Sequence, residues 1–448
     1  MKDNFFLSLF SFAVIIFLFT SNSFAQHDTL VFNLDESIAK ALANNWDMQL
    51  AKKDIEKSQY QINEAYSNAY PRIDFTGNYT RNILLPVLFL PPDNLFNPTP
   101  NTQTIELGSK NSFAATVGIT QVLYNQKVNT AIKIAGEYAS YSEVGSKAAK
   151  ESIILAVKKS FYSILMAEQI VKVTSRSFES AKANSDNVAA LFKQGVASEF
   201  DLLRSQVQVA NIQPTLIQAE NNLELALSSF KNLLTIDLNT PVKIVGNFSF
   251  TDIPQNILEN ANENAADNSP SVRQLKIQES LLEKNIKVEQ ADYYPTLAFF
   301  GQYQYQTQDN NWNLNKYNWA KSFMVGLQLT YNLFDGFGRG ARIQQAVVDK
   351  EKVAIGRSKL EEGIKVQVLQ SILKMNEAKK KIAAQEKSLA QADKALKIAH
   401  TRYSSGVGTQ LEIMDTETAL TLAQTNYSRA IYEYLIARSE WEYSVSIN

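Results

Sequence analysis

The chain contains the same arrangement of motifs twice, and this internal repeat limits its architecture more than any single motif does. A Tyr-Pro pair ending at Pro71 opens a stretch of alternating apolar and polar residues, and a second pair ending at Pro295 opens another. Later in each half, an aromatic residue is followed three positions on by a glycine and a valine, at Gly195 and at Gly406. A unit repeated over this length predicts two structural repeats in one chain.

The start of the chain has the features of a secretory signal peptide. Residues 1–25 contain a basic residue, an apolar run and a small-x-small sequence that ends at Ala25, so we expect export and a mature chain that begins at Gln26. The apolar run is short for a membrane-spanning helix, which needs about 20 residues. We therefore place the first repeat at 26–240 and the second at 241–448.

The residue content argues against several classes of functional site. The chain has no cysteine, which excludes disulfides and thiolate metal sites. Its two histidines, His27 and His400, lie far apart in the sequence, so we expect no histidine metal centre, no catalytic triad and no cofactor. The formal net charge of −1 gives no electrostatic reason to expect nucleic acid as a partner. We do not expect an enzyme.

Two long stretches without proline, 126–192 and 336–403, are predicted to be helices. At about 1.5 Å per residue each would be on the order of 100 Å long. A seven-residue repeat explains what would bury them, because large residues recur at one seam position and mostly small residues three positions later. In the second copy the large residues are Val368, Met375, Ile382, Leu389, Leu396 and Tyr403. The first copy has the equivalent column from Val157 to Phe192.

Each long helix is expected to end at a glycine and return as an antiparallel partner. Gly195 and Gly406 suit the left-handed backbone of such a hairpin turn, and the return helices are predicted over about 198–234 and 409–446. Pro214 lies within the first of these and should kink it. Shorter helical stretches are expected before each Tyr-Pro pair, at about 35–69 and 257–293.

Four segments alternate between apolar and polar residues and are predicted to be strands. They cover about 72–82, 113–124, 296–306 and 323–333. Each has the length of a tilted strand that crosses the hydrocarbon layer. An apolar face opposite a polar face is typical of a membrane barrel with a wet lumen, and a soluble two-layer sheet is the alternative. The connectors 82–112 and 306–322 would then be external loops.

Four strands are too few for a membrane barrel. An open sheet leaves two bare edges, which a bilayer does not tolerate, and the smallest membrane barrels have about eight strands. We therefore expect several copies of the chain to share one barrel, which makes the protein an obligate oligomer in a lipid bilayer.

The order and duplication of these motifs resemble the TolC-type outer membrane efflux protein family. The similarity runs from about Leu34 to Ser446 and includes the turn Leu333-Phe334-Asp335-Gly336 between strand and helix. It implies a mostly α fold with a transmembrane β-barrel portion: two repeats, each with two strands and long antiparallel coiled-coil helices, assemble as a homotrimer. The trimer would form one β-barrel in the outer membrane of a Gram-negative bacterium and an α-helical tunnel in the periplasm.

The resemblance also implies a function and partners. Such a protein would be the passive exit duct of a tripartite efflux or type I secretion system that exports small molecules or proteins. It would join a periplasmic adaptor (membrane fusion) protein and an inner-membrane pump of the RND or ABC type.

The resemblance assigns roles to residues beside the hairpin glycines. Glu412 and Asp415 match two acidic ring positions at the periplasmic gate. Repeated around an axis, they would concentrate negative charge in a narrow opening and favour cations. Two solvated helix residues are the ordinary alternative.

Asp201 and Tyr403 match members of an interhelix lock that holds the gate closed. The lock arginine of the family would fall at Gly408 and its lock threonine at Phe200, so both are missing from this chain. The resemblance therefore predicts a closed state that is held differently or more weakly.

Two other interpretations can be compared with this one. Gly336-Phe-Gly338-Arg-Gly340-Ala341 fits the dinucleotide pattern G-x-G-x-x-A, but that motif needs a buried parallel strand and a βαβ unit, which the alternating strand and long helix here do not predict. A secreted or surface coiled-coil structural protein or adhesin without a pore is the main alternative function. An exported enzyme lacks any supporting group of residues.

Overall fold

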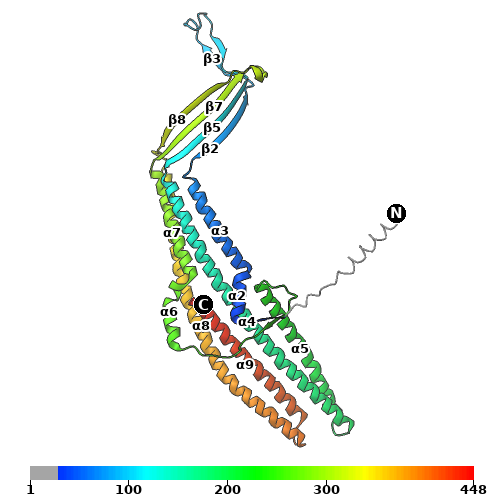
Figure 1. The fold of residues 1–448 in the computed structure, drawn as a ribbon. Coiled ribbons are helices and arrows are strands. Elements are labelled where there is room, and N and C mark those ends of the chain that lie inside the picture. Colours follow the sequence, from blue (N-terminus) through cyan, green and yellow to red (C-terminus); the bar gives the residue numbers. More distant parts are fainter. Residues whose placement is uncertain (1–28, 448) are drawn as a thin grey trace, which may run out of the picture.

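The computed structural model describes residues 29–447, and it has a sheet at one end and a long bundle of helices at the other (Figure 1). The predicted signal peptide, 1–25, and His27 lie outside the described residues. Within residues 29–447 no helix is both long and apolar enough to cross a membrane.

One antiparallel sheet of four strands contains the predicted segments. In spatial order its strands are β2 (Arg72–Arg81), β5 (Asn111–Tyr124), β7 (Thr296–Asp309) and β8 (Ala320–Thr330). The two strands of the first repeat pair with each other, the two of the second repeat pair likewise, and β5 joins β7 at the centre. The two outer strands therefore each have one edge without a partner within the described chain.

The last two strands end at different residues from those predicted, as their backbone pairing shows. We expected strands over about 296–306 and 323–333, but β7 continues to Asp309, and β8 runs three residues earlier at both ends. Thr296 pairs with Thr330, and the residue before Thr296 is Pro295, which has no N–H to extend the ladder. Apolar and polar residues continue to alternate after Thr330, so the alternation alone predicts an end of β8 that is too late in the sequence.

The first connector is more ordered than expected. Within 82–112, strand β3 (Val87–Leu90) pairs with β4 (Gln103–Glu106) in a separate antiparallel hairpin. Between β7 and β8, residues 310–319 contain the short 3-10 helix η2 (Leu314–Lys316).

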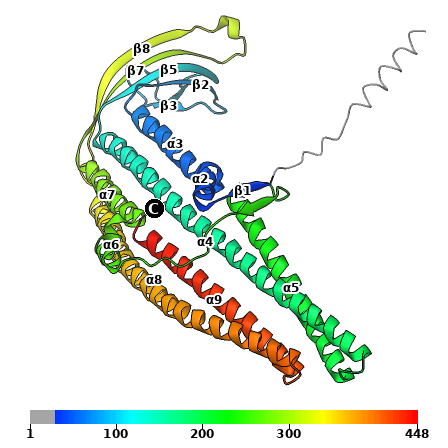
Figure 2. The same cartoon turned by 60° about the horizontal axis from the view of Figure 1, so that its bottom comes forward.

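Two helical hairpins extend away from the sheet. The first consists of α4 (Gln126–Lys193) and α5 (Glu199–Leu233), and the second of α8 (Gly338–Ser404) and α9 (Gln410–Ser444). Figure 2 shows both hairpins running side by side towards the end remote from the sheet. Helix α5 continues through Pro214, which has no N–H to donate to the carbonyl of Ala210.

The seven-residue pattern correctly identifies the buried seam of α8. Val368, Met375 and Ile382 are buried, and so are their small companions Ser371 and Ala378. These large side chains and residues of α9, including Tyr434 and Trp441, form one apolar cluster. A second cluster around Val157, Phe161 and Ile164 of α4 includes Phe230 of α5 and Ala41.

The shorter helical stretches are each divided in two, which corrects their prediction as single helices. The first becomes α2 (Leu34–Asn44) and α3 (Trp46–Ser67), because Asn45 leaves the helical conformation and its side chain accepts from the N–H of Asp47. The second becomes α6 (Gln255–Asn268) and α7 (Pro270–Gln290), since Pro270 occupies the first position of a new helix. A 3-10 turn, η1 (Ala291–Tyr293), follows α7.

A small parallel pair of strands links the two repeats. Strand β1 (Leu30–Phe32) lies beside β6 (Val242–Ile244), which follows the first helical hairpin. The N-terminal part of the described chain is thereby fixed at mid-height on the helices (Figure 2).

Candidate functional site

The register of the sheet separates an apolar face from a polar face across all four strands. One row consists of Phe75, Val117, Tyr303 and Phe323, which are direct partners on successive strands. The next row consists of Thr76, Thr116, Gln304 and Ser322. Partners in an antiparallel sheet share a face and adjacent rows alternate, so one surface is suited to lipid and the other to water.

Exposure of the sheet is consistent with an unfinished barrel. Strand β2 is exposed along its whole length, and β8 is exposed except at Gly326. Phe75 and Phe323 have more than two thirds of their surface uncovered, at 72% and 71%. A lone chain would thus present a wide apolar surface and two bare edges to its surroundings, which a stable soluble protein avoids.

The strand-to-helix turn before α8 is built around Asp335. Its carboxylate accepts from the N–H of Arg339, and the ring centre of Tyr293 lies 4.5 Å from the Arg339 guanidinium carbon. Gly336 has a φ of +68°, which suits a glycine at this turn. The preceding strand is an antiparallel edge strand, so the glycine pattern here is a turn and does not belong to a dinucleotide-binding βαβ unit.

Both glycine turns at the far end of the helices have the same geometry. Gly195 and Gly406 have φ angles of +75° and +74°. In each turn the glycine N–H bonds to a carbonyl three residues earlier, and the next N–H, of Val196 or Val407, bonds five residues back. This is the Schellman arrangement, which satisfies the last carbonyls of a helix and needs a left-handed residue.

Replacing Gly406 with valine should destabilise the α8–α9 hairpin by about 1–2 kcal/mol, because a β-branched residue disfavours the left-handed region. Trypsin should then cut after Arg402 about 5 to 30 times faster if cleavage follows local opening. Gly356→Ala is the control, since no atom lies within 4 Å of its added Cβ and its φ is not in the left-handed region. Equal cleavage of both variants would contradict this explanation of the turn.

Glu412 and Asp415 lie on the first turns of α9, beside the second glycine turn. Glu412 pairs with Arg402 at 3.2 Å, and its N–H is capped by the side chain of Thr409. Asp415 is exposed and has no ion pair among the described residues. The two carboxylates therefore differ, since Arg402 offsets the charge of only one of them. No pattern in the sequence indicated the ion pair between Arg402 and Glu412.

Asp201 and Tyr403 come from different helical hairpins, and the structure brings them within electrostatic range. Burial, and then the negative charge of Asp201, raise the pKa of Tyr403. No hydrogen bond joins these two side chains in the described part of the chain. Instead, Asp201 accepts from the hydroxyl of Ser198 at 2.6 Å, as part of the N-terminal cap of α5.

An arginine does not fit at Gly408, the position where the family resemblance predicts a lock arginine, without movement of the turn. A Cβ at this position would lie 2.7 Å from the backbone nitrogen of Tyr403 and 2.9 Å from the carbonyl carbon of Arg402. Because these are backbone atoms, the turn itself would have to move. Phe200, at the position expected for the threonine, is exposed, and the guanidinium of Arg204 lies 6.0 Å from the centre of its ring.

Two buried polar side chains, Glu417 and Gln410, lie near the tip of the second helical hairpin. Glu417 of α9 is buried and accepts from the hydroxyl of Ser180 on α4. Gln410 is only 5% exposed, and both polar atoms of its amide lack a hydrogen-bond partner. An unpaired buried amide costs free energy, so Gln410 weakens the packing around the start of α9. Positions 410 and 417 are seven residues apart and so lie on one face of the helix, which could have indicated that both are buried.

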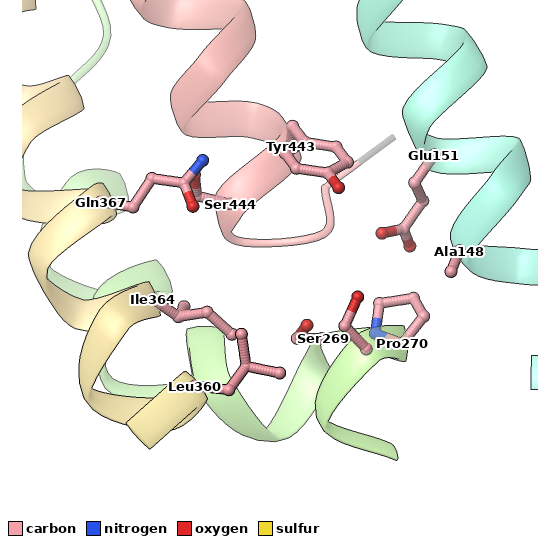
Figure 3. Close-up of a pocket in the computed structure, with 10 residues that line it drawn as sticks. Ala148, Glu151, Ser269, Pro270, Leu360, Ile364, Gln367, Tyr443 and Ser444 are labelled. Atoms are coloured by element: carbon pink, nitrogen blue, oxygen red, sulfur yellow. The ribbon is translucent and has the colours of Figure 1, made fainter. Parts of the chain in front are cut away.

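A small cavity of about 100 Å³ lies where α4, α7, α8 and α9 meet. Figure 3 shows the carboxylate of Glu151 facing Ser269 and Pro270 at the start of α7. Tyr443 lies across the cavity from Ser269 and Pro270. Within the described residues no group of three or more His, Cys, Asp or Glu side chains could hold a metal ion. One carboxylate among hydroxyl groups does not make a catalytic arrangement.

Replacing Glu151 with glutamine should raise the thermal stability of the detergent-solubilised protein at neutral pH. Burial raises the pKa of Glu151, and a hydrogen bond from Ser446 offsets only part of this effect. A raised folded-state pKa stabilises the fold below the unfolded-state pKa, and this contribution is lost as pH rises through the folded-state pKa. The advantage of glutamine should therefore shrink near pH 4.3, roughly the ordinary pKa of glutamate.

Thermal unfolding at the two pH values tests this expectation. Glu143→Gln is the matched control, because Glu143 is exposed on the same helix. If the gain in thermal stability of the Glu151 variant becomes larger at acidic pH, the pKa of Glu151 is not raised in the folded protein.

Comparison with known proteins agrees with this geometry. The family described as "Outer membrane efflux protein" matches residues 37–235 and 262–440, which together are most of the chain. The outer membrane protein TolC of Escherichia coli (strain K12) is 21% identical over 425 residues, which cover 90% of this chain and 80% of TolC. The alkaline protease secretion protein AprF of Pseudomonas aeruginosa is 20% identical, with 92% and 84% covered.

A solved structure shows the same fold. The outer membrane channel CmeC of Campylobacter jejuni matches with a TM-score of 0.73 and 17% identity, covering 92% of this chain and 85% of CmeC. The family matches two segments of the chain, one in each half. The chain therefore belongs to the outer membrane efflux protein family, and it is an outer-membrane channel protein whose helices extend into the periplasm.

Proposed function

We propose that three copies of the chain close one barrel and form the exit duct of a tripartite export system. Each copy has four strands, so two copies would give eight, a number whose interior is filled by side chains. Three copies are the smallest number that leaves an open lumen. The observation that carries the proposal is the sheet itself: it has two bare edges, one apolar face and one polar face.

In this arrangement the edge of β8 in one copy pairs with the edge of β2 in the next. The apolar row that includes Phe75 and Phe323 would then continue around the barrel and face lipid, while the polar row would line the lumen. We place the first repeat over 26–240 and the second over 241–448, in agreement with the division of strands and hairpins between them.

The partners in this proposal are a periplasmic adaptor (membrane fusion) protein and an inner-membrane pump of the RND or ABC type. Relatives named for functions as different as alkaline protease secretion and cation efflux match most of this chain. This range supports a common duct whose cargo, a small molecule or a protein, is chosen by the pump. A surface adhesin without a pore is not supported, because the family is one of efflux channels.

We assign the periplasmic entrance to the tip of the helices. Glu412 and Asp415 would form acidic rings there, and Asp201 and Tyr403 would help to hold the entrance closed. The hydrogen bond from Ser180 of one hairpin to Glu417 of the other supports an entrance that can open, since water can take the place of this polar contact when the hairpins separate. The hairpin turns at Gly195 and Gly406 would surround the opening.

The oligomer and its conductance test the function directly. Purified protein in detergent should migrate near three times the chain mass on unheated gels, and near the single mass after boiling. The same preparation should conduct ions in planar bilayers. Protein that stays monomeric in detergent and gives no current would overturn the proposal.

A further inference from the structure

The β3–β4 hairpin is a fixed extension of the sheet at its outer end. The ladder of β2 and β5 continues into it, because Asn82 N–H bonds to the carbonyl of Lys110 at 2.9 Å and the Asn82 side chain bonds to that of Ser109. Buried Asn97 ties the far end of the hairpin together with hydrogen bonds to three backbone carbonyls. Figure 1 shows the hairpin beyond the strand ends, on the side remote from the helices.

The surface of this hairpin is unusually apolar for a segment outside a membrane. Its exposed large apolar residues are Ile83, Leu84, Val87, Leu88, Phe89, Leu95, Phe96, Ile105 and Leu107. Leu84 and Leu95 are almost fully uncovered, at 88% and 91%. Within the hairpin, residues 83–107, the only charged side chains are Asp93 and Glu106. Many exposed large apolar side chains on one short hairpin indicate an interaction surface.

Lipid chains are not the natural cover for this surface. A row of polar and charged residues crosses the outer end of the sheet, where Arg81, Asn111 and Asp309 are partners on successive strands. Ten residues of β2, at about 3.3 Å each and tilted by about 45°, already span an apolar band about 25 Å tall. The hairpin begins after this row, so it lies at or beyond the level of the lipid headgroups.

A second copy of the chain is the occupant that the geometry favours. The hairpin grows from β2, whose edge is bare and which joins a neighbouring copy in the proposed barrel. Every copy carries the same apolar surface at the same height, and each hairpin has only two charged side chains, Asp93 and Glu106, to oppose the contact. Both faces of the hairpin carry large apolar side chains: Leu88 pairs with Ile105 on one face, and Val87 and Phe89 lie on the other, opposite Glu106 and Thr104.

We propose that the β3–β4 hairpins of neighbouring copies pack on one another above the barrel and narrow its outer mouth with an apolar constriction. The inference rests on the proposed shared barrel. Apolar constrictions impede ions by excluding water, so the outer mouth would resist passage independently of the periplasmic entrance. Export of a wide cargo would require the hairpins to separate.

Cross-linking tests the contact, because the natural chain has no cysteine to interfere. Phe89→Cys, treated in intact cells with a short bis-maleimide, should lose most of its monomer band on boiled gels and gain a cross-linked species. Lys316→Cys is the matched control on the other external loop and should remain monomeric after boiling. A heat-sensitive oligomer that forms normally but does not cross-link at position 89 would overturn the inference.

Failure of the shared barrel would look different, because no oligomer would appear on unheated gels in any variant. A second test attaches a fluorophore to the thiol of the Phe89→Cys variant. Quenching of this fluorophore by nitroxide-labelled lipids would place the hairpin in the bilayer and would also overturn the inference. Replacing residues 83–107 with a short Gly-Ser turn should leave the oligomer intact and raise its single-channel conductance. Unchanged conductance would rule out a constriction by the hairpins.

Discussion

Replacing Val117 with lysine should abolish the folded oligomer, whereas the same replacement at Thr116 should leave it intact. Val117 lies at the middle of β5, between Phe75 and Tyr303 on the apolar face. A lysine there would face lipid near the middle of the bilayer, which costs about 2–4 kcal/mol for each copy. Because every copy carries the change, the cost is multiplied in the assembled barrel.

Thr116 provides a closely matched control, since it is the adjacent residue on the same strand. Its partners are Thr76 and Gln304, so the new charge would lie on the polar face and in contact with water. Unheated gels of outer-membrane fractions should show the oligomer for the Thr116 variant and little or none for the Val117 variant. Equal losses in both variants, or loss only at Thr116, would show that the faces are assigned wrongly.

Replacing Asp415 with asparagine should weaken block of the channel by a trivalent cation added on the periplasmic side. A loss of about 1.4 kcal/mol in cation binding corresponds to a tenfold weaker block. Glu412→Gln should have a smaller effect, because Arg402 already offsets that carboxylate at 3.2 Å. Arg402→Ala should strengthen the block, since it leaves the Glu412 charge without its partner.

Planar-bilayer titration with hexaamminecobalt(III) measures all three variants on one scale. Asp349→Asn, in a pair with Lys352 near the start of α8, controls for loss of a carboxylate elsewhere on the helices. If the Asp415 variant is blocked as strongly as the unmodified protein, the acidic residues do not line the conducting path. If Glu412→Gln has the larger effect, the pair with Arg402 does not persist in the assembled channel.

The repeats, the long helices and the four strands were all visible in the sequence, because each depends on a short-range pattern. A seven-residue spacing identified Val368, Met375 and Ile382 as buried, and alternation identified the sheet. The ends of β8 were wrong, since they depend on where the partner strand begins after Pro295. The β3–β4 hairpin was missed because its residues do not alternate and its prolines suggested a plain loop.

At the tip of the helices, too, some features were predictable from the sequence and others were not. The positive φ of Gly195 and Gly406 followed from their place between helices, and the positions of Glu412 and Asp415 came from a family resemblance. The pair between Arg402 and Glu412 joins two helices across a turn, so no pattern along one helix could predict it.

The sequence by itself determined that this protein has two similar halves, which helix faces are buried, and that four strands with opposite polar and apolar faces need other copies. These properties follow from residue spacing, which local backbone geometry converts directly into sides of a helix or strand. Only the tertiary structure decided that β5 joins β7 across the two repeats, that the Asp201 carboxylate lies close enough to Tyr403 to raise its pKa, and that an apolar hairpin extends the sheet. Such contacts bring together residues distant in sequence, and they depend on how complete elements pack rather than on the preferences of any one segment.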